Sequence, residues 1–152
     1  MKILVDADAC PGREIIEHAA KLYDVPVVMY CDINHALRSD YSEIRYMDSG
    51  FQSVDIAIAN DAEAGDIIVT QDYGVAAMAL GKRAFAINPK GYIYDEQNIE
   101  RLLFERHLAG KIRRGGGRTE SHKKRNVKDD VRLKINLTGI IEKALSGRNH
   151  DE

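Results

Sequence analysis

Short apolar runs alternate along the chain with longer segments in which apolar residues recur every three or four positions. The runs are rich in β-branched residues and bounded by turn-forming residues, which is typical of buried strands. Five strands are predicted, over residues 2–6, 26–31, 42–47, 66–70 and 83–88. Because most of these runs are continuous rather than alternating, both faces of the sheet should be covered, as in a mostly parallel sheet.

The segments between these strands have the apolar spacing of α-helices. Pro11 suits the first position of the first helix, where its missing N–H costs nothing. Ser53 can cap the second helix, which Gly65 ends, and the glycines at 115–117 end the strongly amphipathic fourth helix. The predicted helices cover residues 12–23, 53–64, 73–80, 95–112 and 127–145, and residues 34–39 form either a short helix or a loop.

Right-handed crossovers place the first strand in the centre of the sheet, with strands two and three on one side and strands four and five on the other. The expected fold is therefore α/β, with a mostly parallel five-stranded sheet of order 3-2-1-4-5 and helices on both faces. In open sheets of this kind ligands bind beyond the carboxyl ends of the strands, where the strand order reverses. The predicted crevice lies between strands one and four.

Four aspartates fall at that edge of the predicted sheet. Asp6 and Asp8 lie at the carboxyl end of the first strand. Asp72 lies two residues beyond the fourth strand, and Asp55 lies in the first turn of the second helix. Asp66 opens the fourth strand at the opposite edge, so we leave it outside the site.

Carboxylates that converge on one crevice repel one another, by about 4 kcal/mol for a pair about 4 Å apart at an effective dielectric constant near 20. A hard divalent cation removes this repulsion and prefers oxygen ligands, which indicates Mg²⁺ or Mn²⁺. Asp8, Asp55 and Asp72 also lie near helix N-termini, where a capping role explains each of them equally well. Asp6 has no capping role and would suffer desolvation at the end of a central strand, so it depends most on a cation.

The length of 152 residues is most simply one domain, spanning 1–152, and 44% apolar with 30% charged residues is ordinary for a globular protein. The chain shows no secretory signal and no apolar run of about 18 residues that could span a membrane. Cys10 and Cys31 are too few for a disulfide framework. We therefore expect a cytoplasmic protein with reduced thiols and no membrane partner.

The net charge of −2 conceals an uneven distribution. Residues 1–110 carry a net charge of −8, and residues 111–152 carry +6. The basic excess begins in a glycine-rich arm at about 113–126, before a C-terminal helix at about 127–146, and such asymmetry indicates a nucleic-acid partner. A solvated tail is the alternative, and the absence of interleaved aromatic residues gives no support for base stacking. The candidate phosphate-binding residues are Arg113, Arg114, Arg118, Lys123, Lys124 and Arg125.

Other chemistries fit the chain less well. The sequence VDADAC also matches the two aspartates of haloacid-dehalogenase phosphatases, but no lysine closely follows Asp72. Cys10 lacks the arginine spacing of a cysteine phosphatase loop and is better explained as a small buried residue behind the site. The five histidines show no zinc spacing, and no glycine-rich nucleotide-binding loop follows a strand.

Four stretches of the chain resemble the YaiI/YqxD family of uncharacterised bacterial proteins, which have a PIN-like nuclease fold. These stretches are VDADACPG at 5–12, DSGFQSVDIAI at 48–58, GDIIVTQDYGVAAMAL at 65–80 and AINPKGYIYDEQNI at 86–99. The resemblance implies a single PIN-like domain, a three-layer α/β/α sandwich with the 3-2-1-4-5 sheet. PIN nucleases use three or four acidic residues to bind Mg²⁺ or Mn²⁺ and cut single-stranded RNA. By position, the acids carried over are Asp6, Asp8, Asp55 and Asp72, with two after the first strand and one after the fourth, a set displaced from the usual PIN pattern.

The leading hypothesis from the sequence is a metal-dependent phosphodiesterase, a ribonuclease that acts on single-stranded RNA. Asp6 and Asp72 are the expected direct ligands of Mg²⁺ or Mn²⁺, and Asp8 and Asp55 ligate the cation or orient water. Thr70 and Ser53 either donate supporting hydrogen bonds or serve only as a strand end and a helix cap. The alternative is a non-catalytic RNA- or protein-binding module with a relic acidic pocket, and a homodimer is left open.

Overall fold

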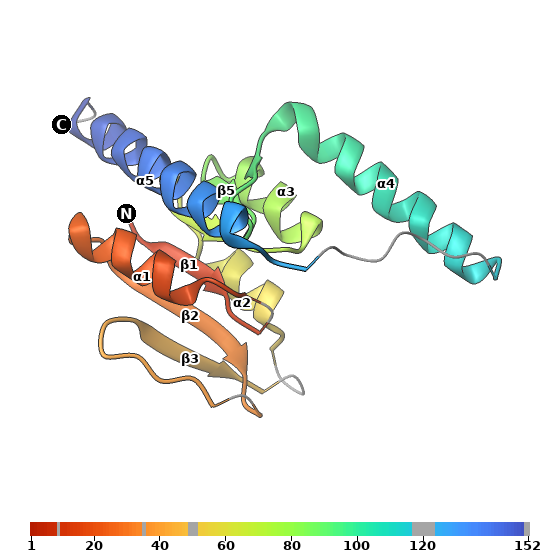
Figure 1. Cartoon of the computed structure of the whole chain (residues 1–152), viewed down its shortest axis with the longest axis horizontal. Helices are drawn as coiled ribbons and strands as arrows, with labels where there is room; N and C mark the ends of the chain where they lie inside the picture. The colour runs from red at the N-terminus through yellow and green to blue at the C-terminus, as the bar shows by residue number, and fades with distance from the viewer. Residues whose placement is uncertain (9, 35, 49–51, 117–123, 151–152) are drawn as a thin grey trace.

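A computed structural model describes residues 1–8, 10–34, 36–48, 52–116 and 124–150, and it contains one six-stranded sheet (Figure 1). The order β3-β2-β1-β4-β5-β6 confirms the predicted 3-2-1-4-5 arrangement, and all pairs except β5–β6 are parallel. The sixth strand, a two-residue antiparallel addition after the turn at 89–91, was not predicted. The strands are β1 Ile3–Asp6, β2 Val27–Asp32, β3 Glu43–Met47, β4 Ile67–Val69, β5 Phe85–Ile87 and β6 Ile93–Tyr94.

Helices cover both faces of the sheet. On one face α1 and α5 pack against each other and against a core that includes Ile16, Leu133 and Leu137. On the other face α2 and α3 cover a second core that includes Ile58 and Ala76. The helices are α1 Arg13–Leu22, α2 Val54–Asp61, α3 Tyr73–Gly81, α4 Glu96–Arg114 and α5 Val127–His150.

The alternation of side chains along β1 decides which layer each residue faces. Ile3 and Val5 belong to the core under α1 and α5, whereas Leu4 belongs to the core under α2 and α3. Because successive side chains of a strand point to opposite faces, Asp6 shares the face of Leu4. The last residue of the central strand is thus directed toward the layer whose helices begin near Asp55 and Asp72.

Three predicted helix boundaries were wrong. One is the end of the C-terminal helix, since α5 runs to His150 rather than to about residue 146. Pro11 lies in a turn rather than at the first helical position, because Gly12 adopts φ +93° as the residue before the helix and α1 begins at Arg13. The predicted second helix extended to residue 64, but α2 ends at Asp61 because Ala62 already has an extended backbone. The glycine-rich end of the fourth helix was predicted correctly, since α4 stops at Arg114 before Gly115.

The amphipathic pattern of α4 did not predict its environment. Ile99 is buried, and Leu102 and Leu103 pack beside it against α3 and its core. Beyond these first turns α4 projects away from the sheet, on the side to which the strands point (Figure 1), so Phe104, with 64% of its surface exposed, lies in solvent. The pattern defines an apolar face, but the body of the protein ends before the helix does.

None of the helices in the described part of the chain is long and apolar enough to cross a membrane.

Candidate functional site

The site begins with Asp6, at the carboxyl end of a strand that lies between β2 and β4. Thr70 follows β4, and its hydroxyl lies 3.2 Å from Oδ2 of Asp6, to which it donates a hydrogen bond. Thr70 is fully buried, and its Oγ1 also accepts a hydrogen bond from the backbone N–H of Asp72 at 3.0 Å. One hydroxyl therefore links the ends of the two strands that flank the predicted crevice.

The electrostatics of Asp6 shows that the four predicted acids share one region. Burial raises the pKa of the Asp6 carboxyl above its usual value of 3.8, although the hydrogen bond from Thr70 acts in the opposite direction. The negative charges of Asp8, Asp72 and Asp55 raise this pKa further. Carboxylates from three different parts of the chain thus act on Asp6, as the strand order requires.

Asp72 and Asp55 face a common hollow at the N-terminal ends of α3 and α2. The Asp72 carboxylate caps α3, since it accepts the N–H groups of Gly74 at 2.7 Å and Val75 at 3.1 Å. The Ser53 hydroxyl hydrogen-bonds Asp55 rather than the end of its own helix, and this bond lowers the pKa of Asp55. The hollow has a volume of about 240 Å³ and is lined by Asp55, Ile56, Ala59, Asp72, Gly74, Val75 and Met78.

Asp8 lies on the loop between β1 and α1, and its side chain reaches the neighbouring strand β2. Its Oδ1 accepts the backbone N–H of Asp32, the last residue of β2, at 2.8 Å. This bond holds the loop across the carboxyl ends of two adjacent strands. The second aspartate of the pair therefore has a structural contact that Asp6 does not make.

The donor set restricts how a metal ion could be held. Within the described ranges, no three His, Cys, Asp or Glu side chains come close enough together to form a metal site by themselves. Some of the oxygens are already in use, because Asp72 caps a helix and Asp8 accepts a backbone N–H. These residues suit a hard cation that is bound by one or two carboxylates and completed by water and substrate oxygens, the usual arrangement for Mg²⁺.

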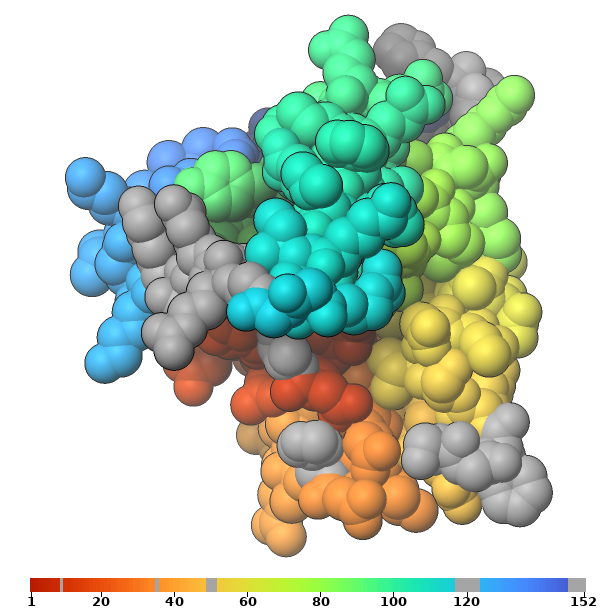
Figure 2. Space-filling view, turned by 90° about the vertical axis from the view of Figure 1, so that its right-hand side faces the viewer, coloured from red at the N-terminus to blue at the C-terminus, as the bar shows by residue number. Residues whose placement is uncertain are grey.

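A basic face of α4 lies beside the acidic edge. Arg113 and Arg114 were predicted from the sequence as phosphate-binding candidates, whereas Arg106 was not recognised. Arg106 Nη1 is 3.7 Å from Oδ1 of Asp72, and Arg113 and Arg114 follow two turns later. Figure 2 looks onto the end of the sheet toward which the strands point, and α4 stands over this face. The charges at Glu100 and Glu105 hid the pattern, but helical spacing places Arg106 and Arg113 on the same side as Leu103.

The remaining candidates from the basic arm divide into three groups. Arg118 and Lys123 lie outside the described residues. Lys124 is exposed. The Arg125 guanidinium donates to the carbonyl of Pro89 and to the Asp130 carboxylate, each at 2.7 Å, so this residue anchors the end of the arm to the body.

The two cysteines are buried free thiols, which agrees with the expected packing role of Cys10. Burial raises the pKa of the Cys10 thiol to about 12 and also raises that of Cys31. Because the thiolate is the nucleophile, we expect neither cysteine to react with Ellman's reagent in the native protein at pH 8, and both to react in denaturant. Rapid labelling of one thiol in the native state would contradict this prediction.

The sheet order, the acids at the strand-order reversal and the basic α4 define an α/β protein with a mixed acidic and basic site at the carboxyl edge of a mostly parallel sheet. The chain belongs to the family described as "Uncharacterized BCR, YaiI/YqxD family", whose model matches residues 4–143, as the resemblance had indicated.

Relatives match this chain over almost its whole length. A UPF0178 protein of Clostridium novyi is 64% identical over 149 residues, which cover 98% of this chain and 100% of the relative. UPF0178 proteins of Clostridium tetani and Ruminiclostridium cellulolyticum are 63% and 55% identical, over 95% and 97% of this chain and 99% and 96% of their own. No solved structure shows a significant match.

Proposed function

We propose that this protein is a metal-dependent phosphodiesterase that cleaves single-stranded RNA. The observation that supports the proposal most directly is the position of Asp6, a partly buried carboxyl at the strand-order reversal whose pKa is raised by burial and by three neighbouring acids. A carboxylate in these surroundings is favoured when a cation is present. The basic face of α4 beside it supplies the attraction for phosphate that an acidic edge lacks.

We propose that some residues of the site bind the metal ion and that others position the carboxylates and the attacking water. Thr70 fixes the Asp6 carboxylate with a hydrogen bond, and Ser53 fixes that of Asp55. Asp6 and Asp72 are the proposed ligands, while Asp8 and Asp55 orient water at the same edge. When bound, Mg²⁺ or Mn²⁺ lowers the pKa of a coordinated water and stabilises charge on the phosphate and leaving oxygen.

RNA is the proposed substrate because a long polyanion matches the distribution of basic residues. Arg113, Arg114 and Lys124 are exposed, and we propose that Arg118 and Lys123 belong to the same phosphate-contacting set. Each neutralised phosphate would make binding weaker as salt increases. We place Arg125 outside this set, as a residue that holds the arm against the body.

The proposal is tested by the variant Asp8→Asn, assayed on a fluorescent single-stranded RNA with Mn²⁺. We expect cleavage to fall at least about tenfold, because Asp8 lies beside the proposed ligands and its charge acts on Asp6. The matched control is Asp24→Asn, since Asp24 is an exposed aspartate in the loop between α1 and β2 at the other end of the sheet. A parent that cleaves no faster with Mn²⁺ than with EDTA, or an Asp8→Asn variant as fast as the parent, would refute the nuclease proposal.

The capped and paired state of Asp72 favours a second candidate, a non-catalytic RNA-binding module with a relic acidic pocket. Its carboxylate is shared between two backbone N–H groups and Arg106. Isothermal titration with MnCl₂ separates the two candidates. If the parent binds Mn²⁺ and the Asp6→Asn variant does not, the result supports the phosphodiesterase. If the parent binds RNA but does not bind Mn²⁺, the result supports the RNA-binding module.

A further inference from the structure

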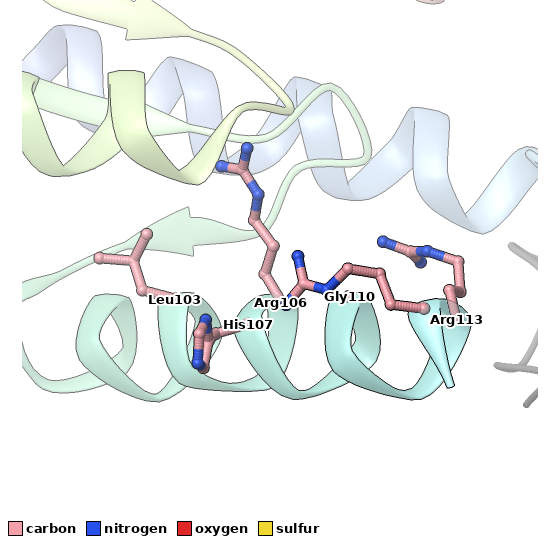
Figure 3. A pocket seen from close by; sticks show the side chains of 6 residues that line it. Leu103, Arg106, His107, Gly110 and Arg113 are labelled. Atoms are coloured by element: carbon pink, nitrogen blue, oxygen red, sulfur yellow. The ribbon is translucent and has the colours of Figure 1, made fainter. Parts of the chain in front are cut away.

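A second hollow lies on the side of α4 that faces the body, beyond its contact with α3. It is lined by Leu103, Arg106, His107, Gly110, Arg113 and Arg114 (Figure 3), and its volume is about 350 Å³. We propose that this hollow is a binding subsite for one phosphoryl group of a single-stranded RNA, separate from the acidic site. The identity of the ligand rests on the proposed function, but binding at this subsite needs no metal ion.

The charges around the hollow are of one sign. Arg106 points from α4 toward α3 (Figure 3), and its only carboxylate within 4 Å among the described residues is that of Asp72, at 3.7 Å. No described carboxylate lies within 4 Å of Arg113 or Arg114. A guanidinium group is weakly hydrated and can donate two parallel hydrogen bonds to the oxygens of one phosphate. Three guanidinium groups around one hollow therefore suit a phosphoryl group.

Gly110 lies in the middle of this arrangement, one turn after Arg106 and about one turn before Arg113 and Arg114. A glycine inside a helix costs about 0.5–1 kcal/mol relative to alanine. A Cβ built at Gly110 would meet no other atom within 4 Å, so packing does not require glycine here. The missing side chain keeps the floor of the hollow open between the arginines.

The helix dipole explains only part of the pattern. Basic residues in the last turn of a helix are favoured by its negative end, which accounts for Arg113 and Arg114 without any ligand. Arg106 lies two turns earlier, outside the range of this effect. The helix dipole also gives no reason for a glycine at position 110. The contact between Arg106 and Asp72 also places the hollow next to the acidic site. A single RNA molecule can therefore reach both the hollow and the acidic site.

The phosphoryl group has two possible sources, an internal diester of the strand or a 5′-terminal phosphate. An internal diester carries one negative charge, whereas a terminal phosphate carries nearly two at neutral pH. Oligonucleotides with a 5′-phosphate and with a 5′-hydroxyl therefore distinguish the two sources while testing the same site.

The experiment measures the fluorescence anisotropy of a 3′-labelled oligouridine with EDTA present, so that neither a metal ion nor cleavage contributes. The test variants are Gly110→Leu, which fills the hollow without changing charge, and the double variant Arg113→Gln/Arg114→Gln. The matched controls are Gly139→Leu, at an exposed glycine of α5 that also has nothing within 4 Å, and Arg101→Gln/Lys111→Gln, which removes the same charge from α4 at exposed positions outside the hollow.

We expect each test variant to bind about tenfold more weakly than its control, the loss expected for a charge-assisted hydrogen bond. The double test variant should also lower the salt slope by about 0.7 for each lost phosphate contact. If the parent prefers the 5′-phosphate and the test variants do not, the source is terminal; equal losses with both oligonucleotides identify an internal diester. Test variants within twofold of their controls would overturn the subsite.

The two proposals fail independently. RNA affinity that depends on Gly110 and the arginines, without cleavage under any divalent cation, would leave the subsite standing and refute the phosphodiesterase. Cleavage that depends on Asp8 while the α4 variants bind like their controls would refute the subsite alone.

Discussion

Replacing Asp6 with asparagine is expected to reduce Mn²⁺-dependent RNA cleavage by about a thousandfold and to abolish stabilisation of the protein by Mn²⁺. Asp6 is the proposed ligand at the inner end of the central strand, and the loss of one preorganised charge at a reacting centre costs about 10²–10³ in rate. Any ion that binds only the folded chain raises its melting temperature, so thermal unfolding with and without MnCl₂ measures the ligand role directly.

The same substitution should leave the metal-free protein at least as stable as the parent at pH 7. The Asp6 carboxylate is disfavoured by burial and by the charges of neighbouring acids, which raise its pKa above 3.8. An asparagine side chain at this position would be neutral and could still accept the hydrogen bond from Thr70. A variant that loses activity without losing stability is the signature of a residue retained for function.

The pH dependence has a defined sign. A carboxyl with a raised pKa in the folded state contributes its full stability below the unfolded value of 3.8, and this contribution is lost as the pH rises through the folded pKa. The free energy of unfolding of the parent, minus that of Asp6→Asn, should therefore increase as the pH falls from 7 toward 3.8. Taking the difference cancels the contributions of carboxyls that do not interact with Asp6, and a flat difference would contradict the raised pKa.

Asp66 provides the contrast because it is a buried aspartate at the opposite edge of the sheet. It accepts the backbone N–H groups of Lys2 and Glu63 and pairs with the Lys2 ammonium at 2.8 Å. Asp66→Asn should cost about 2 kcal/mol of stability, because bonds to a charged acceptor are lost. The Asp66→Asn variant should still be stabilised by Mn²⁺. If Asp66→Asn and Asp6→Asn both lost this stabilisation, a special role of Asp6 would be refuted.

The central part of the fold follows from local patterns in the sequence. Continuous apolar runs identified β1, β2, β4 and β5, and alternation identified β3. Crossover handedness then ordered the strands, which brought Asp6, Asp55 and Asp72 to one edge. The strand β6 was not predicted because its two residues, Ile93 and Tyr94, are too few to show a strand pattern and follow the turn-forming residues Asn88, Pro89 and Gly91. Its pairing depends on the neighbouring β5, not on local preference.

The parts that could not be predicted depend on contacts between distant segments. In the sequence Arg125 is one member of a basic run, but in the structure it anchors the end of the arm to the body. Gly12 leaves space for its side chain, because a Cβ at Gly12 would lie 2.7 Å from Nη2 of Arg125. The role of Arg106 depends on the angle at which α4 leaves the sheet and reaches Asp72. Helical periodicity indicates which residues share a face, but it does not indicate what that face meets.

The largest loss of stability is expected for Gly91→Ala, in the turn between β5 and β6. Gly91 has φ +90°, and a Cβ there would lie 2.5 Å from the carbonyl carbon of Arg132 and 2.7 Å from Cα of Leu133, both in the backbone of α5. Backbone atoms of a helix cannot move aside as a flexible side chain can. The positive φ costs about 1–2 kcal/mol and the overpacking about 1–3 more, so a total near 3 kcal/mol is expected.

The turn at Pro89, Lys90 and Gly91 is also the hydrogen-bonded attachment of α5. Arg132 donates to the carbonyl of Lys90 at 3.1 Å, and Asn136 donates to that of Gly91 at 2.7 Å. Leu133, Leu137 and Ile141 are fully buried beneath this attachment. Displacing the turn by one methyl group should therefore loosen the whole helix, which hydrogen exchange along residues 127–147 would detect.

Gly65→Ala is the matched control, because Gly65 has φ +86° but no atom within 4 Å of a built Cβ. It carries the backbone strain without the clash, so it should cost only about 1–2 kcal/mol. Urea unfolding of both variants then isolates the contact with α5. Equal midpoints would show that α5 can yield to the added methyl group, whereas the expected lower midpoint for Gly91→Ala would identify this turn as the point at which the C-terminal helix is held against the sheet.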